Sequence, residues 1–111
     1  MSENCIFCKI ANGEIKSEFV YENEYVFAIN DLSPQAPVHV LVIPKKHVAS
    51  LNELEDETLM AEMIKGVKAV CKKLDLKEYR TVINTGETAG QSVFHLHFHI
   101  MAGRKMNWPA G

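Results

Sequence analysis

The chain has 111 residues, of which 47% are hydrophobic and 23% charged, and this length allows one compact domain that buries about two-thirds of its unfolded surface. Twelve Lys and Arg against fourteen Asp and Glu give a formal net charge of −2, which disfavours a surface for duplex nucleic acid. No apolar run reaches the roughly 18 residues of a membrane span, and the N-terminus lacks a secretion signal. We therefore expect a cytoplasmic protein without a membrane partner.

The first half of the chain predicts short elements. Residues 7–12 form one helical turn that stops at Gly13, and residues 19–22 and 26–30 form two strands around the polar Asn23-Glu24, which indicates a hairpin. Pro34 breaks the pattern, because proline cannot donate to a strand ladder. A further strand covers residues 38–43 and ends at Pro44.

The second half predicts the longest element, an amphipathic helix over residues 56–74. Its apolar residues recur at spacings of three and four, namely Leu59, Met63, Val67, Val70 and Leu74. Gly66 costs such a helix about 1 kcal/mol relative to Ala, which a close approach by another backbone would explain. Residues 79–85 and 92–101 read as strands around a loop at 86–90, so the class is α+β. The tail from residue 102 is irregular, and Trp108 suggests that it docks on something.

Three cysteines are present, Cys5, Cys8 and Cys71. An odd count with one isolated member does not resemble a disulfide framework, so reduced thiols are expected. The pair Cys5 and Cys8 has three interpretations: a metal knuckle, a redox dithiol, or two small hydrophobic residues under a helix. The local spacing leaves all three open.

Three of the five histidines alternate with apolar residues in the segment 95–101. In a strand, His95, His97 and His99 share one face at spacings of about 6 to 7 Å, while Leu96, Phe98 and Ile100 anchor the other face in the core. Such a row of imidazoles has three interpretations. It can bind a metal ion, it can supply a nucleophile that attacks phosphorus near neutral pH, or it can be a polar face that only contacts solvent. The preceding loop, residues 86–92, offers backbone N–H groups and the Ser92 hydroxyl to an anion, which favours a phosphoryl group.

At these residues the sequence resembles the histidine triad (HIT) family, and the likeness extends along the chain. Asn30 to Pro37, His39, Val42 to His47, Gly90 to Val93, Gly103-Arg104 and Trp108-Pro109 resemble the Hint branch, the purine nucleoside phosphoramidases. The resemblance implies a single HIT domain over residues 1–111. It also implies a HIT-like fold with an antiparallel sheet of about five strands, one long helix and a short N-terminal helix.

The resemblance implies hydrolysis of the P–N bond in purine nucleoside 5′-phosphoramidates, which are AMP or GMP joined to an amine. His97 is then the nucleophile that forms a covalent nucleotidyl-histidine, with His99, His39 and Ser92 as the other catalytic residues. The matching nucleotide-binding positions are Asp31 for the ribose, Leu32, Ile29, Ile6, Phe7 and Ile10 for the base, and Asn84, Gln91, Ser92, Val93, His97 and His99 for the phosphate. Two alternatives remain: a dinucleoside polyphosphate hydrolase, and a non-catalytic purine nucleotide sensor or scaffold.

The resemblance implies no catalytic metal, but some HIT-like proteins carry the cysteine pair together with two histidines. The matching set here is Cys5, Cys8, His47 and His95. Four protein ligands are typical of structural zinc, which leaves no open position for water, and His95 would then not act on the substrate. The family also forms homodimers, so Met60, Met63 and Val67 could meet a partner chain, and Trp108 could border the partner's site.

Overall fold

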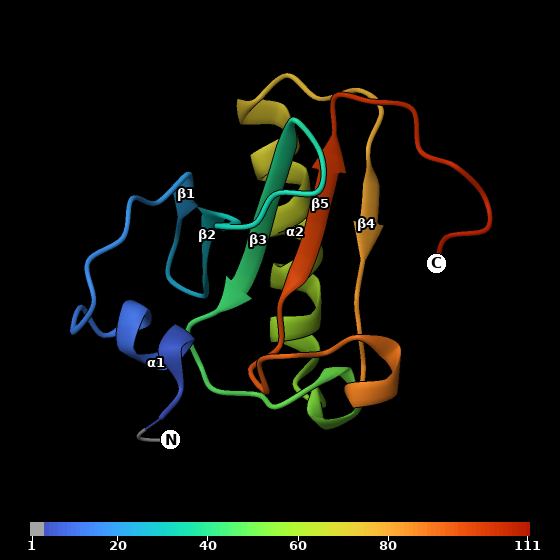
Figure 1. Ribbon diagram of the computed structural model, residues 1–111. Helices are drawn as coiled ribbons and strands as arrows, with labels where there is room; N and C mark the ends of the chain where they lie inside the picture. The colour runs from blue at the N-terminus through green and yellow to red at the C-terminus, as the bar shows by residue number, and fades with distance from the viewer. Residues whose placement is uncertain (1–3) are drawn as a thin grey trace.

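The computed structural model describes residues 4–111, which form a five-stranded antiparallel sheet with the strand order β1-β2-β3-β5-β4 (Figure 1). The long helix α2 crosses one face of the sheet, and the short helix α1 packs against the other. The α+β class and the five-stranded sheet are confirmed. The elements are α1 (Ile6–Ala11), β1 (Tyr21–Glu22), β2 (Val26–Asn30), β3 (Val38–Pro44), η1 (Leu51–Glu53), α2 (Glu57–Lys73), β4 (Arg80–Val82), η2 (Glu87–Ala89) and β5 (Phe98–Ala102).

The strands have different neighbours on their two faces, because successive side chains of a strand point in opposite directions. The core under α2 takes alternate residues of the three central strands, namely Val26, Ala28, Val40, Val42, Phe98 and Ile100. The opposite face of β2 and β3 packs on α1 through Phe27, Ile29, Leu41 and Ile43. His39 and His99 belong to this second face by the same alternation. The sheet therefore buries one face under α2 and presents its imidazoles on the other.

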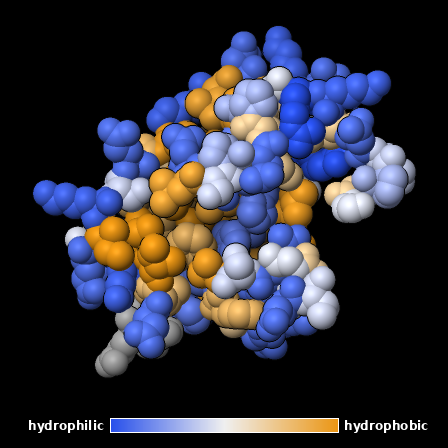
Figure 2. Space-filling view, viewed as in Figure 1, coloured by the Kyte–Doolittle hydropathy of each residue, from blue (hydrophilic) through white to orange (hydrophobic). Residues whose placement is uncertain are grey.

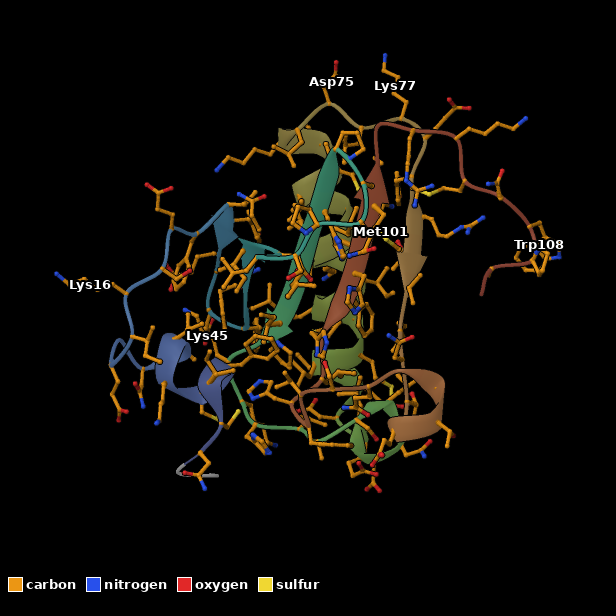
Figure 3. The ribbon with its side chains drawn as sticks, viewed as in Figure 1. Lys16, Lys45, Asp75, Lys77, Met101 and Trp108 are labelled. Carbon is orange, nitrogen blue, oxygen red and sulfur yellow. The ribbon has the colours of Figure 1, made fainter. Side chains whose placement is uncertain are left out.

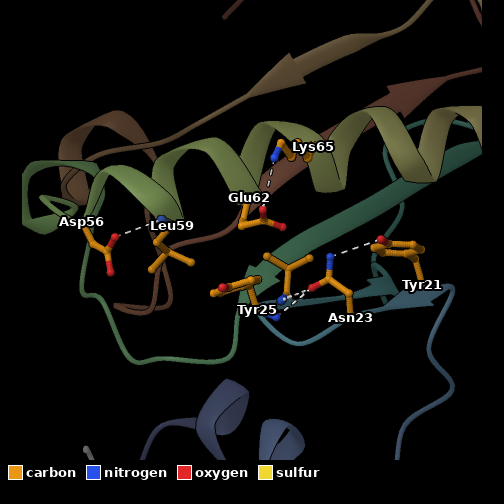
Figure 4. A network of polar contacts seen from close by, with 8 residues as sticks. Tyr21, Asn23, Tyr25, Asp56, Leu59, Glu62 and Lys65 are labelled. Carbon is orange, nitrogen blue, oxygen red and sulfur yellow. Dashed lines mark hydrogen bonds and ion pairs between the residues drawn. The ribbon is translucent and has the colours of Figure 1, made fainter.

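Local hydrogen bonds fix the ends of these elements (Figure 4). Asn23 Oδ1 accepts from the backbone N–H groups of Tyr25 and Val26, at 2.8 and 2.9 Å, which closes the predicted hairpin between β1 and β2. Asp56 caps α2, since its Oδ1 accepts from the N–H of Leu59 at 3.2 Å. The predicted helix is thus confirmed, and the structure adds its cap.

Gly66 of α2 faces the sheet. A Cβ atom at this position would lie 3.1 Å from a methyl group of Val26 and 3.1 Å from one of Val42. A close approach is present, but valine side chains make it rather than the backbone that the sequence led us to expect, and it explains why a glycine stands in the middle of the helix.

Three strands are shorter than predicted. The predicted strand over residues 92–101 is wrong in its first half, because β5 begins only at Phe98. Its pairing with β3 ends at Val42 and Phe98, although β3 continues to Pro44, because the segment before Phe98 bonds elsewhere: the N–H of Leu96 donates to the carbonyl of Val48 at 2.7 Å. The expected alternation nevertheless continues through Leu96, which is 1% exposed in the α2 core. Residues 19–22 and 79–85 likewise shorten to β1 and β4.

The exposed fractions of the side chains change two expectations about their contacts. Met63 and Val67 are 0% and 5% exposed in the α2 core, so neither is available to a partner, whereas Met60 is 41% exposed. Trp108 is 83% exposed, and it lies on the tail beyond the β4 edge of the sheet (Figure 3). Its predicted docking therefore does not take place within the described part of the chain. Across residues 4–111, no helix combines the length and the apolar character needed to cross a membrane.

Candidate active site and metal centre

A cavity of about 590 Å³ opens on the sheet face that carries α1, and hydrophobic side chains gather over α1 on this side of the molecule (Figure 2). Its walls come from α1, the end of β2 with the turn after it, β3, the loop before β5, and β5 itself. The lining residues are Ile6, Phe7, Ile10, Ile29, Asn30, Asp31, Leu32, Ser33, Gln35, His39, Leu41, Gly90, Ser92, Val93, His97 and His99. One end of the cavity is therefore apolar, and the other carries imidazoles, a carboxylate and a hydroxyl.

His97 has a fixed ring orientation. Its Nδ1 lies 2.8 Å from the backbone carbonyl oxygen of His95. Because a carbonyl can only accept, Nδ1 carries the hydrogen and Nε2 of the neutral ring carries a lone pair. The ring is 8% exposed, and it contacts Phe7 edge-on at a centroid distance of 5.2 Å and His99 at 5.1 Å. Residue 97 thus presents a nucleophilic nitrogen on a rigid ring beside the cavity.

His99 is oriented by a chain of hydrogen bonds. The backbone N–H of Gln35 donates to Nδ1 of His39 at 3.0 Å, so the hydrogen of the neutral His39 ring sits on Nε2. That Nε2 lies 2.9 Å from Nδ1 of His99, which therefore accepts. The hydrogen of neutral His99 is consequently on its Nε2, so this ring is a hydrogen-bond donor in the cavity.

Electrostatics keep His99 neutral at physiological pH. Burial lowers its pKa to about 4, and the neighbouring rings of His97 and His39 add to this effect, while the Asp31 carboxylate opposes it. Oδ2 of Asp31 lies 3.5 Å from His39 Nε2, and Oδ1 accepts from the N–H of Ser33 at 2.7 Å. The carboxylate is thereby held in an Asx turn at the cavity wall.

Asp31, His39 and His99 also have ligand atoms within 4.8 Å of one another, a spacing that could hold a metal ion. The hydrogen bond from Gln35 opposes this use. A metal on Nε2 of His39 would require that nitrogen to lose its hydrogen, while Nδ1 is already an acceptor from a fixed N–H. Asp31, His39 and His99 are therefore better described as a chain of hydrogen-bonded side chains than as a metal site.

A second cluster of four possible ligand atoms includes His95, two residues before His97. Cys5 Sγ lies 3.2 Å from His95 Nδ1, Cys8 Sγ 3.2 Å from His47 Nδ1, and the two Nδ1 atoms are 3.1 Å apart. Ligands at zinc bond lengths of 2.0 to 2.3 Å would be about 3.3 to 3.8 Å apart in a tetrahedron, so the cluster is close to that geometry. Cys5, Cys8, His47 and His95 could therefore bind a metal ion.

The surroundings of His95 suit a metal ligand. Its Nε2 lies 2.8 Å from the carbonyl oxygen of Pro44 and carries the hydrogen, which leaves the lone pair of Nδ1 directed at the cluster. The ring is completely buried, and burial lowers its pKa to about 4. His95 therefore supplies its side chain to the cluster and its backbone carbonyl to His97.

Comparisons with known proteins identify the family of the chain. The family model described as the HIT domain matches residues 12–106. The chain belongs to the HIT family. It is 48% identical to an uncharacterised HIT-like protein of Synechococcus elongatus over the full length of both chains.

Solved HIT structures have the same fold. A HIT family hydrolase from Legionella pneumophila superimposes with a TM-score of 0.92 at 44% identity, covering 97% of this chain and 100% of the other. A hypothetical histidine triad nucleotide-binding protein from Sulfolobus tokodaii gives a TM-score of 0.77 at 42% identity, covering 87% of this chain and 67% of the other. The HIT fold is thus shown over nearly the whole chain.

The HIT cavity brings together most of the residues that the sequence indicated. Ile6, Phe7, Ile10, Ile29, Asp31, Leu32, His39, Ser92, Val93, His97 and His99 line it. Leu32 stands at the rim, because it is 97% exposed. Asn84 and Gln91 are not among the lining residues, and Asn84 lies instead against Gly90.

Gln91 stabilises the loop of residues 86–92, a role that the sequence analysis missed. Its buried side chain accepts from the N–H of Gly86 at 2.9 Å and donates to the carbonyls of Ala49 and Val93, at 2.7 and 3.1 Å. These bonds fold the loop that presents Ser92 and Val93 to the cavity. A long amide side chain between small residues was the available signal.

Proposed function

We propose that the protein hydrolyses the P–N bond of purine nucleoside 5′-phosphoramidates, as expected for the Hint branch of the family. The observation that carries this proposal is the hydrogen bond of 2.8 Å from His97 Nδ1 to the carbonyl of His95. It directs the lone pair of the ring to Nε2, next to the donor His99, in a cavity of nucleotide size. An imidazole nucleophile beside an N–H donor suits substitution at phosphorus.

The reaction proceeds in two displacements. In the first, His97 Nε2 attacks phosphorus, the P–N bond breaks, and the leaving nitrogen takes the proton of His99 Nε2 and departs as the free amine. In the second, water attacks the phosphorus of the nucleotidyl-histidine and returns a proton to His99 Nε2, which releases the nucleoside monophosphate and restores neutral His97 and His99. The His99 Nε2–H and the Ser92 hydroxyl donate to the nonbridging oxygens or the leaving group.

The cavity walls suit a purine nucleoside. Phe7, Ile10 and Ile29 are 6 to 8% exposed and form an apolar end that favours a flat base. Asp31 lines the same cavity, 3.5 Å from His39 Nε2, and its carboxylate can accept from ribose hydroxyls. The relative from Sulfolobus tokodaii is a hypothetical nucleotide-binding protein, which supports the same ligand class.

We further propose that Cys5, Cys8, His47 and His95 hold a structural zinc ion. Two thiolates and two imidazole nitrogens near tetrahedral spacing are a donor set that zinc favours. When bound, the ion supplies a cross-link rather than a catalytic water, because all four positions are taken by protein. It joins α1, which carries Phe7, to the segment that carries His97.

We also propose a homodimer. Met60 and Ile64 on α2 are 41% and 53% exposed, and Trp108 on the tail is 83% exposed, so apolar side chains remain for a partner. Light scattering should give twice the mass of the chain, and a mass of one chain would reject the dimer.

The decisive experiment replaces the nucleophile. His97→Asn keeps the size and a donor but lacks an attacking nitrogen, so it should lower kcat with adenosine 5′-phosphoramidate by about 10³-fold or more. AMP binding, measured by calorimetry, should remain within a few-fold of wild type. Acid-free quenching of the wild type followed by peptide mass analysis should find an adenylyl group on His97.

The outcomes separate the possible functions. A His97→Asn variant that keeps more than a few per cent of the wild-type rate would exclude the nucleophile. AMP binding without any turnover by the wild type would replace the enzyme with a nucleotide sensor. Faster cleavage of diadenosine polyphosphates than of phosphoramidates would change the substrate class.

A further inference from the structure

The start of the C-terminal tail contacts the turn between β2 and β3. Arg104 Nε donates to the backbone carbonyl of Gln35 at 3.0 Å, and its Nη1 donates to the carbonyl of Lys105 at 3.1 Å. Gly103 lies so close to Pro37 that a Cβ atom would be 2.9 Å from the proline Cβ. The tail therefore fixes the backbone of a turn whose residues line the cavity.

Gln35 is the point at which this contact meets the histidines. Its carbonyl accepts from Arg104, and its N–H donates to His39 Nδ1 at 3.0 Å. That second bond determines which nitrogen of His39 carries the hydrogen, and His39 in turn determines the tautomer of His99. The Asp31 carboxylate, 3.5 Å from His39 Nε2, favours the same arrangement. The three bonds form a continuous path from Arg104 to a ring in the cavity.

We propose that Arg104 is a positioning residue for His99, acting through the backbone of Gln35 and the ring of His39. The inference rests on the proposed function, and it adds a residue outside the cavity to the reaction. With Gln35 held, His39 keeps its hydrogen on Nε2 and His99 keeps its hydrogen on the nitrogen that faces the substrate. Without that restraint, His39 can exchange its hydrogen to Nδ1, and Nδ1 of His99 loses its donor.

The chemical consequence depends on the leaving group. A phosphoramidate of an alkylamine must receive a proton as its P–N bond breaks, so it needs a donor in the site. The p-nitrophenyl ester of AMP releases a stable phenolate and does not need one. A defect in the donor tautomer therefore slows the first substrate and spares the second, whereas a general loss of structure slows both.

The kinetic test compares Arg104→Ala with Lys105→Ala, which removes the neighbouring positive charge but keeps the backbone carbonyl that Arg104 contacts. We expect Arg104→Ala to lower kcat for the alkylamine phosphoramidate about tenfold, a part of the factor that a general acid contributes, and to lower kcat for the p-nitrophenyl ester less than twofold. Lys105→Ala should change neither rate by more than twofold. Equal losses on both substrates, or no loss, would overturn the proposal.

A direct measurement reads the tautomers. Long-range ¹H–¹⁵N spectra of ¹⁵N-histidine-labelled protein distinguish Nδ1–H from Nε2–H rings, and the wild type should show His39 and His99 both as Nε2–H. Arg104→Ala should introduce an Nδ1–H population of His39. Gln35→Pro, which removes the N–H itself, should produce a larger one. A wild-type His39 in the Nδ1–H form, or spectra unchanged in both variants, would contradict the path.

The two hypotheses fail differently. If the wild type cleaves neither substrate, the proposed function is wrong, but the spectra still decide whether Arg104 and Gln35 set the His39 tautomer. If the wild type cleaves both and the Arg104→Ala spectra are unchanged, the enzyme stands and the positioning role is wrong.

Discussion

Replacing Gly66 by alanine tests the contact between α2 and the sheet. The new Cβ atom would lie 3.1 Å from methyl groups of both Val26 and Val42, while ordinary carbon contacts are at about 3.5 to 4.0 Å. Both valines are 0% exposed, and they belong to the neighbouring strands β2 and β3. Neither can move aside without displacing a strand, because their side chains are stiff and fully packed.

Two opposing effects set the magnitude. Alanine favours the helix over glycine by about 1 kcal/mol, and inserting a methyl group into a packed core costs about 1 to 3 kcal/mol. We therefore expect Gly66→Ala to lower the free energy of unfolding by about 1 kcal/mol. For a chain of this size that corresponds to a fall of roughly 4 to 6 °C in Tm.

Thermal and urea unfolding followed by circular dichroism measure this change. Ala61→Gly, at an exposed position of the same helix, reports the propensity effect alone and should cost about 1 kcal/mol. In a double-mutant cycle, Val42→Ala should relieve part of the crowding from Gly66→Ala. If Gly66→Ala instead raised Tm by the full propensity gain, the close approach of helix and sheet would be refuted.

Three further outcomes are expected. Removing metal with a chelator, or replacing Cys8 by serine, should lower the free energy of unfolding by about 3 kcal/mol or more. The control variant Cys71→Ser should keep one metal equivalent by elemental analysis. Equal metal loss in the two cysteine variants would contradict a metal site at the cluster. Burial lowers the pKa of His99 to about 4, so the unfolded chain binds a proton that the folded ring does not between pH 6.5 and 4, and stability falls as the pH is lowered through this range. Melting curves of His99→Gln should show a shallower fall, and parallel curves would contradict the shifted pKa. Gly103→Ala should lower stability by about 1 to 2 kcal/mol, because its φ is +95° and its Cβ would meet Pro37; an unchanged Tm in the same assay would exclude that strain.

Local pattern was sufficient for the elements whose patterns are regular. The spacing of Leu59, Met63 and Val67 predicted α2, and the polar Asn23-Glu24 predicted the hairpin. The alternation from Leu96 to Ile100 also predicted correctly which side chains enter the core. It misplaced the start of β5, because the backbone before Phe98 leaves the ladder with β3, and the N–H of Leu96 donates to Val48 instead.

The local sequence pattern could not predict contacts between side chains that are far apart in the sequence. That His95 faces the cysteines while His97 and His99 face the cavity depends on Pro44 and on α1, which lie 51 or more residues away. The side-chain bonds of Gln91 and the backbone bond of Gln35 to His39 carry no periodic signal. The resemblance to the family indicated the candidate site residues. Only the hydrogen-bond partners in the structure showed which ring nitrogens carry a hydrogen.

The register between β3 and β5 determines whether His39 and His99 point into the cavity. His39 is opposite Met101 and His99 is opposite Leu41. A slip of one residue in either strand would turn its imidazole towards α2 and turn an aliphatic neighbour towards the cavity. Misregistered chains would lose core packing and the histidines that we propose for catalysis together, so a preparation that melts cooperatively should contain few molecules with a disrupted cavity.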